Sequence, residues 1–253
     1  MGTELVRMEN IVKAFGPVRA LQGVTMTVNE KEIVGLVGDN GAGKSTLMKI
    51  LSGSYTATSG EIYIKGKHVT IKNTRDAINL GIETIHQDSA LVPQLSVARN
   101  LFLGREPTRG WIFMSHLDRN FMRTESRRLL RRVGIEKNID SDTLITALSG
   151  GERQSIAIAR AMFFEADLLI LDEPTNNLGI TESQGVLRFI REAREAGHSS
   201  IFVTHNIHHV FQIVDRILVL RRGFLVQDIR RDETTVEEIE TAITGMVTSK
   251  NPA

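Results

Sequence analysis

The sequence contains no cysteine, and this absence excludes disulfide bonds and thiolate metal ligands. Aromatic residues make up only 5% of the 253 residues, within an apolar fraction of 41% that is ordinary for a globular chain. No apolar run approaches the ~18 residues that a membrane-spanning helix needs. Residues 1–7 contain no long apolar segment either, so we expect no signal peptide.

The chain also lacks an excess of charge, because 31 Lys and Arg residues face 30 Asp and Glu residues, for a formal net charge of +1. Nucleic-acid-binding domains are usually strongly basic, so this balance gives no support to such a function. One basic cluster stands out, and it comprises Arg123, Arg127, Arg128, Arg131 and Arg132. Its spacing favours a solvated helix face over a nucleic-acid patch.

The segment 38–46 fits the phosphate-binding pattern G-x-x-x-x-G-K-[ST], called Walker A. We expect a short buried strand over 32–37 before it and a helix over 45–51 after it. The glycines allow backbone N–H groups to approach phosphate oxygens, to which Lys44 would add a positive charge. Ser45 is the expected Mg²⁺ ligand in this pattern, and Thr46 is left to bond an α-phosphate oxygen. The predicted nucleotide-binding residues here are Gly38, Asp39, Asn40, Gly41, Ala42, Gly43, Lys44, Ser45 and Thr46. The alternative is a glycine-rich turn that binds nothing.

Two adjacent carboxylates, Asp172 and Glu173, follow the apolar run 168–171. Four apolar residues in series are typical of a strand buried on both faces of a parallel sheet. At its end, Asp172 would meet Mg²⁺ directly or through water, and Glu173 would act as a base or orient a water molecule. The alternative is a polar strand end without a catalytic role.

The remaining pattern predicts an α/β chain whose sequence is β-rich at the start and helical in the middle. The expected strands are a β-rich region over 4–37, then 59–67, 81–87 and 199–204, with a hairpin over 217–226. The expected helices are 73–80, 153–164, 181–196 and 236–244, with a helical pattern from 96 to about 148 that is interrupted at 105–110.

For two sets of side chains, the sequence allows more than one role. Phe15 lies in a loop-like context, where it could stack on a purine or pack onto the local core. His205, His208 and His209 have i, i+3, i+4 spacing, which could suggest a metal-binding face. We reject zinc there, because no nearby cysteine or carboxylate in the sequence completes a site.

Five marks stand in a fixed order: Walker A, Gln87, the segment 148–152 (Leu-Ser-Gly-Gly-Glu), the Asp172–Glu173 pair and His205. This order resembles the ATP-binding subunit of ABC transporters over nearly the whole chain. The resemblance implies an α/β fold, with a P-loop NTPase core built on a mainly parallel sheet. It also implies an N-terminal antiparallel β subdomain and a helical subdomain inserted at about 96–160, all within one ATP-binding domain over 1–253.

The resemblance also implies roles for individual residues around bound ATP and Mg²⁺. Phe15 looks like the aromatic residue that stacks on adenine, and Gln87 like the glutamine that touches Mg²⁺, beside the ligands Ser45 and Asp172. Glu173, His205 and Lys44 would form the catalytic group, with Glu173 directed at the attacking water and His205 at the γ-phosphate. The signature residues Ser149, Gly150 and Gly151 would contact ATP held by a second copy, which implies a head-to-tail homodimer.

The segments 87–106 and 38–41 look like those of bacterial simple-sugar importers of the ribose, xylose and fructose kind. The length is similar to the single-domain fructose-type form, which would lie on the cytoplasmic face of the cell membrane beneath a permease served by an extracytoplasmic sugar-binding protein. The alternatives are a soluble ABC ATPase that acts on a ribosome or DNA, and a nucleotide-gated binding module without useful turnover.

One departure from the family pattern is Gly179. In the family, the segment that follows the Asp172–Glu173 pair usually carries Asp at this position. This difference predicts slower or less cooperative hydrolysis.

Overall fold

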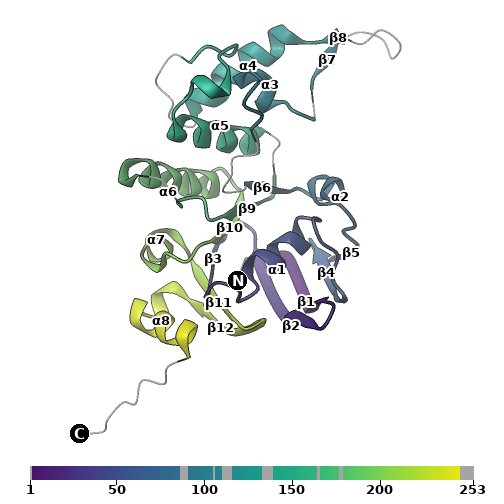
Figure 1. The fold of residues 1–253 in the computed structure, drawn as a ribbon, viewed down its shortest axis with the longest axis vertical. Helices are drawn as coiled ribbons and strands as arrows, with labels where there is room; N and C mark the ends of the chain where they lie inside the picture. The colour runs from purple at the N-terminus through teal and green to yellow at the C-terminus, as the bar shows by residue number, and fades with distance from the viewer. Residues whose placement is uncertain are drawn as a thin grey trace, which may run out of the picture.

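The computed structural model describes residues 2–85, 91–104, 106–109, 116–132, 139–163, 166–176 and 179–245. Figure 1 shows a larger sheet with helices on one side and a smaller sheet on the other, and a group of helices that projects beyond both sheets. Within the described residues, no helix is both long enough and apolar enough to cross a membrane.

The larger sheet has six strands in the order β12-β11-β3-β10-β9-β6. All neighbouring pairs are parallel except β11 and β12. Val203 of β10 pairs with Leu36 of β3 on one side and with Asp172 of β9 on the other, so these three strands end at one edge. The strand bounds are β3 Ile33–Val37, β6 Ile82–Ile85, β9 Leu168–Asp172, β10 Ser199–Val203, β11 Arg216–Arg221 and β12 Phe224–Arg230.

Continuous apolar runs form the central strands because both faces of the sheet are covered. Val34 and Leu36 of β3 belong to a cluster shared with the smaller sheet and helix α1, Lys44–Leu51. Ile33 and Val37, which point the opposite way, belong to a second cluster on the helix-covered face. The predicted mainly parallel core is therefore confirmed.

The smaller sheet is antiparallel, in the order β2-β1-β4-β5, as predicted for the N-terminal region. Its strands are β1 Glu4–Phe15, β2 Val18–Asn29, β4 Ser59–Ile64 and β5 Lys67–Val69. The loop context expected for Phe15 is wrong, because this residue is the last of β1 and pairs with Val18. The predicted short helix over 73–80 is α2, Thr74–Asn79, which Asn73 caps.

Three helices cover the second face of the larger sheet: α6 Ile180–Glu195, α7 Ile207–Ile213 and α8 Val236–Thr244. Helix α8 begins with a capping box between Thr235 and Glu238. Helix α7 was not predicted from the sequence. Its start is marked by Asn206, whose side chain accepts a hydrogen bond from the His209 backbone N–H at 3.2 Å.

The projecting group consists of helices α3 Val97–Leu101, α4 Arg119–Arg132 and α5 Gly150–Phe163. They share a third hydrophobic cluster that includes Leu101, Met122 and Ile156. The predicted interruption contains part of a two-stranded ribbon, β7 Thr108–Arg109 with β8 His116–Leu117. Short 3₁₀ turns occupy Ile145–Ala147 and Arg231–Glu233. The limits 96–160 for an inserted subdomain stay a prediction.

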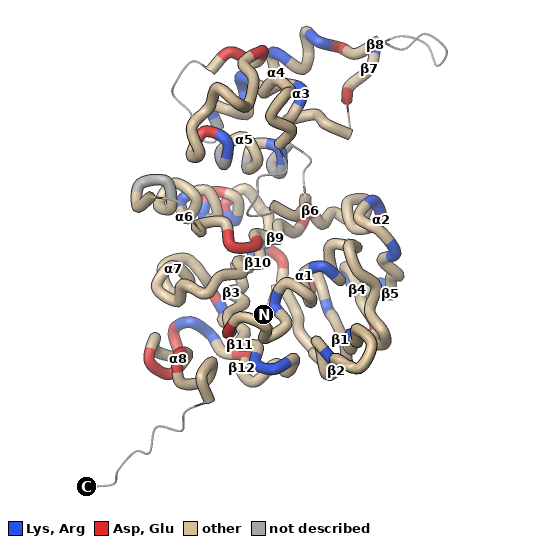
Figure 2. The backbone as a smooth tube through the Cα atoms, viewed as in Figure 1, with Lys and Arg blue, Asp and Glu red and all other residues tan. Residues whose placement is uncertain are grey.

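Helix α4 explains the basic cluster. Its apolar side chains Met122, Leu129 and Leu130 are buried, whereas Arg123, Arg127, Arg128 and Arg131 are exposed. Figure 2 shows this run of basic positions along α4. The predicted solvated helix face is confirmed for these four arginines; the side chain of Arg132 lies outside the described set.

Candidate nucleotide-binding site

The Walker A loop connects β3 to α1 in a conformation that depends on glycine. Gly38, Gly41 and Gly43 have φ values of 149°, 82° and 110°. A Cβ atom on Gly38 would lie 2.1 Å from the carbonyl oxygen of Leu220, and one on Gly43 would lie 2.8 Å from that of Ala20. The loop therefore packs closely between β11 and β2, and any larger residue at either position would displace it.

Lys44 is the first residue of α1, and its side chain folds back over the loop. Its Nζ atom donates hydrogen bonds to the carbonyl oxygens of Gly38 at 2.5 Å and Asp39 at 3.0 Å. Burial lowers the pKa of Lys44, against the opposing effect of the carboxylates of Glu173, Asp172 and Asp39. A nucleotide phosphate would offer this ammonium group a stronger, charged acceptor than either carbonyl.

The two carboxylates at the end of β9 occupy different environments. The Oδ1 atom of Asp172 is buried. Glu173 has a φ value of 50°, a left-handed conformation that costs roughly 1–3 kcal/mol in a non-glycine residue and is concentrated at functional sites. Its backbone N–H donates to the carbonyl oxygen of Val203 at 2.9 Å, so the turn remains attached to β10.

Residues that follow β10 hold the side chain of Glu173. Thr204 Oγ1 donates a hydrogen bond to Glu173 Oε2 at 3.2 Å, and His205 Nδ1 lies 3.0 Å from Glu173 Oε1. The side chain of His205 is 60% exposed, against 18% for Glu173. The carboxylate is thus oriented by its neighbours, while the imidazole projects from the strand edge.

A cavity of about 550 Å³ lies at this edge of the sheet. Most of the residues that line it were predicted as nucleotide-binding or catalytic: Asp39, Asn40, Gly41, Gly43, Lys44, Ser45, Thr46, Glu173 and His205. Ala20 and Asn176 line the cavity too, and neither was predicted from the sequence. Asn176 belongs to the same turn as Glu173, and its N–H donates to the Glu173 carbonyl oxygen at 3.1 Å. Its closeness to Glu173 in sequence was the available signal; Ala20 carried none.

Several predicted residues do not line this cavity. Gly38 and Ala42 shape the loop without lining the cavity, and Asp172 is not among the lining residues either. Phe15 packs edge-to-face on Tyr55, with 5.5 Å between ring centroids. Gln87 lies outside the described residues.

The signature residues Ser149, Gly150 and Gly151 also lie away from the cavity, at the start of α5. The Ser149 backbone N–H donates to Glu152 Oε2 at 2.8 Å, and the Glu152 N–H donates to Ser149 Oγ at 3.3 Å. This reciprocal cap fixes the helix start. A Cβ atom on Gly150 would meet no atom within 4 Å, so the turn faces open space.

The donor set suits magnesium better than zinc. Ser45 supplies a hydroxyl oxygen in the cavity, and Asp172 supplies a carboxylate at the end of β9. Mg²⁺ is commonly held by one or two protein oxygens together with substrate phosphates. Across the described part of the chain, no group of three or more His, Cys, Asp or Glu side chains could hold a metal ion by itself.

Comparison with known proteins matches residues 21–176 to the family model described as ABC transporter. The chain is 42% identical over 248 residues to the xylose/arabinose import ATP-binding protein of Sulfolobus acidocaldarius, covering 98% of this chain and 97% of that one. It is 40% identical to the ribose import ATP-binding protein of Caldanaerobacter subterraneus, covering 95% of this chain but about half (48%) of that protein. The structure is similar to that of a nucleotide-free ATP-binding cassette from an ABC transporter, with a TM-score of 0.80, 25% identity and 95% coverage of both chains.

Proposed function

The chain belongs to the ABC transporter family, and we propose that it hydrolyses ATP to power the import of a simple sugar through a membrane permease. The observation that carries the proposal is the cavity at the sheet edge. There the ends of β3, β9 and β10 bring a phosphate-binding loop with Lys44 next to Glu173 and His205.

Each group around the cavity has a distinct task in phosphoryl transfer. The loop N–H groups and Lys44 hold the phosphates and stabilise charge that develops on them. Glu173 orients the attacking water and accepts its proton, since its carboxylate is held by Thr204 and His205. His205 projects toward the γ-phosphate position. Mg²⁺, held by Ser45 and Asp172, would neutralise phosphate charge.

The active form in this proposal is a head-to-tail homodimer. The cavity lacks the signature residues 149–151, although their exposed turn at a helix N-terminus suits an anion. A second copy would place its signature turn over the bound γ-phosphate and complete the site.

The sugar class is supported by the relatives, whose names specify import of xylose or arabinose and of ribose. The proposal includes a permease and an extracytoplasmic sugar-binding protein as partners, with this chain at the cytoplasmic face of the membrane. Selection of the sugar would then belong to those partners.

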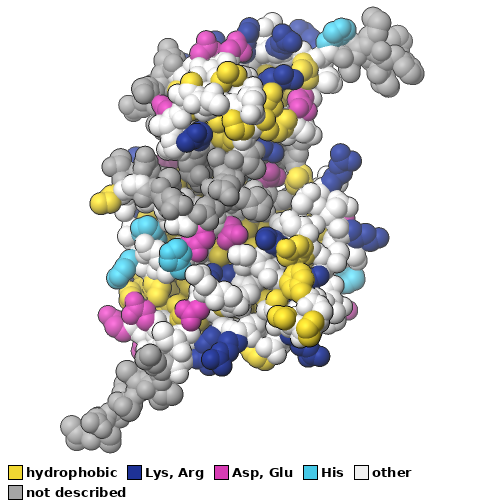
Figure 3. Space-filling view, in the orientation of Figure 1, with side chains coloured by type: hydrophobic (Ala, Val, Ile, Leu, Met, Phe, Trp, Pro, Cys, Tyr) yellow, Lys and Arg dark blue, Asp and Glu magenta, His cyan; other side chains and the backbone are white. Residues whose placement is uncertain are grey.

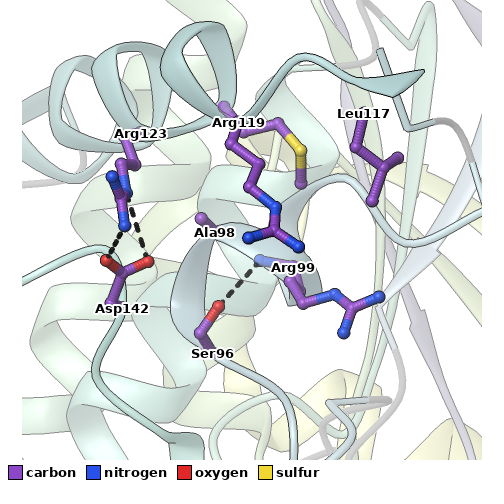
Figure 4. A pocket seen from close by; sticks show the side chains of 8 residues that line it. Ser96, Ala98, Arg99, Leu117, Arg119, Arg123 and Asp142 are labelled. Carbon is purple, nitrogen blue, oxygen red and sulfur yellow. Dashed lines mark hydrogen bonds and ion pairs between the residues drawn. The ribbon is translucent and has the colours of Figure 1, made fainter. Parts of the chain in front are cut away.

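The alternative, action on a ribosome or DNA, finds little support in the basic cluster. Figure 4 shows a second cavity, of about 250 Å³, beside α4, in which Arg123 faces Asp142. Their side chains form an ion pair with 2.5 Å between Nη2 and Oδ2, and Arg128 pairs with Glu125 at 3.4 Å. Part of the cluster is therefore neutralised within the protein, whereas nucleic-acid binding requires basic groups available to phosphates.

Two measurements test the proposal. The purified chain should release phosphate from ATP in a Mg²⁺-dependent reaction. When the tagged chain is expressed in its native host and membranes are solubilised gently, a polytopic permease should co-purify with it. Recovery with ribosomes alone would keep the ATPase but contradict sugar import, and absence of phosphate release in both preparations would contradict the ATPase.

A further inference from the structure

Two residues outside the cavity join the segments that carry Glu173 and His205. The Nδ1 atom of His209 and the Oγ1 atom of Thr175 are 3.1 Å apart, within hydrogen-bonding distance. Thr175 belongs to the turn that follows Glu173, and His209 lies in the first turn of α7, where Figure 3 shows histidine side chains gathered. Neither residue lines the cavity, so any effect on hydrolysis has to pass through their neighbours.

This bond closes a ring of hydrogen bonds that begins and ends at the turn of Glu173. Glu173 accepts from the Thr204 hydroxyl, whose oxygen accepts from the Asn206 backbone N–H at 3.1 Å. The Asn206 side chain accepts from the His209 backbone N–H, and the His209 ring returns to Thr175. Two strand ends and the start of a helix are thereby held in one arrangement.

The ring includes Glu173, whose strained backbone conformation has to be held by neighbouring residues. Glu173 has the left-handed φ value of 50°, and such a conformation persists only where neighbouring structure holds it. On one side of the turn, the Glu173 N–H is bonded to β10. On the other side, Thr175 is only 7% exposed, and its hydroxyl is bonded to α7 through His209. The turn is thus held on both sides of the strained residue.

The protonation state of His209 suits a hydrogen bond to the Thr175 hydroxyl. Burial lowers the pKa of His209, and the nearby charge of His208 lowers it further. The ring is therefore neutral near pH 7, where it can exchange a hydrogen bond with the Thr175 hydroxyl without desolvating a charge.

We propose that His209 and Thr175 are positioning residues, whose hydrogen bond fixes the Glu173 carboxylate relative to His205 for water attack. The inference rests on the proposed ATPase function. Misplacing a reacting group by about 1 Å can cost ~10²-fold in rate, so losing one of several supports is expected to cost ~10-fold in kcat. ATP affinity should stay within about twofold, because neither residue touches the nucleotide cavity.

The test compares kcat, ATP affinity and melting temperature across a small set of variants. Thr175→Val keeps the shape and removes the hydroxyl, and His209→Leu removes the ring nitrogen; each should lower kcat ~10-fold. Thr175→Ser and His209→Asn restore a hydrogen-bonding atom near the lost one and should recover most of the rate. The double variant Thr175→Val/His209→Leu should be no slower than either single variant, because each single substitution already removes the same hydrogen bond.

His208→Leu is the matched control, since His208 is an exposed neighbour on the same helix turn. It should leave kcat unchanged. Full kcat in both Thr175→Val and His209→Leu would overturn the inference while leaving the ATPase proposal intact. Equal losses in the Asn and Leu variants at position 209 would also overturn it, because the bond would then not matter. Failure of the wild-type chain to hydrolyse ATP would instead contradict the proposed function.

Discussion

The chain carries two glycine-rich turns at helix starts, and they differ in how they are supported. The Walker A loop is enclosed by its own chain: Gly38 and Gly43 pack against the backbone of β11 and β2, and Lys44 is buried. The signature turn is closed only by its Ser149–Glu152 cap, and Gly150 faces open space. In the proposed function the first turn binds phosphate by itself, whereas the second is a half-site that a second copy of the chain would complete.

The largest effect is expected when the Walker A loop loses the ammonium group of Lys44. Lys44→Ala should lower ATP hydrolysis by ~10³-fold and weaken ATP binding, since it removes a preorganised charge aimed at the phosphates. Lys49→Ala, on the same helix but stacked near Tyr55, is the control and should have little effect. Isothermal calorimetry and phosphate release would check both. Near-normal turnover in Lys44→Ala would contradict the assigned site.

Glu173→Gln separates ATP binding from hydrolysis in the same cavity. The variant should lose ~10²-fold or more in hydrolysis rate, because the positioned base is lost. ATP should still bind, and size-exclusion chromatography with ATP should show an accumulated dimer, since the nucleotide that joins the two copies is no longer consumed. A rate within a few-fold of wild type would remove Glu173 from its role.

A charge in the signature turn tests the half-site. Gly150→Asp places a carboxylate where the partner's γ-phosphate would bind, so we expect hydrolysis to fall by ~10²-fold and ATP-dependent dimerisation to be lost. Binding of ATP to the single chain should remain. Gly185→Asp is the matched control, because a Cβ atom at this exposed position of α6 also meets nothing within 4 Å. Unchanged dimerisation in Gly150→Asp would contradict the sandwich arrangement.

The smallest effect is expected at Gly179, just before α6. Gly179→Asp should raise the hydrolysis rate or the Hill coefficient about twofold if the missing carboxylate is what limits coupling between two sites. Gly179→Asn would give a similar helix cap without the charge, and a cap changes stability by only a few tenths of a kcal/mol relative to glycine. If neither the rate nor the Hill coefficient changes in Gly179→Asp, the predicted role of this position is wrong.

Most of the fold could be predicted from local sequence patterns. Apolar runs predicted the central strands because both faces of the sheet are buried, and Asn73 and Gly81 marked the ends of a short helix. Helix α7 was missed, since its seven residues are too short for a clear period and its histidines suggested a metal face instead. Phe15 was placed in a loop because Gly16 and Pro17 follow it, although strand pairing extends to it.

The candidate site was predictable where all the residues of one contact lie in a single continuous motif, as they do for Lys44 and the loop around it. Ala20 was missed because its place in the cavity depends on how separate segments meet, whereas Asn176 belongs to the same turn as Glu173 and was passed over. The ring through Thr204, Asn206, His209 and Thr175 has the same origin, since its members come from two strand ends and a helix start. A single sequence carries no signal for such pairings.

The third hydrophobic cluster gives the projecting helices a stiffness of their own. Its residues belong to α3, α4, α5 and the segments beside them, separate from the two clusters that hold the sheets together. A force applied at the start of α5 is therefore passed to α3 and α4 by close-packed side chains with low compressibility. We therefore expect the projecting helices to move together as one body when the signature turn is displaced, so that a contact made there also shifts α3 and α4.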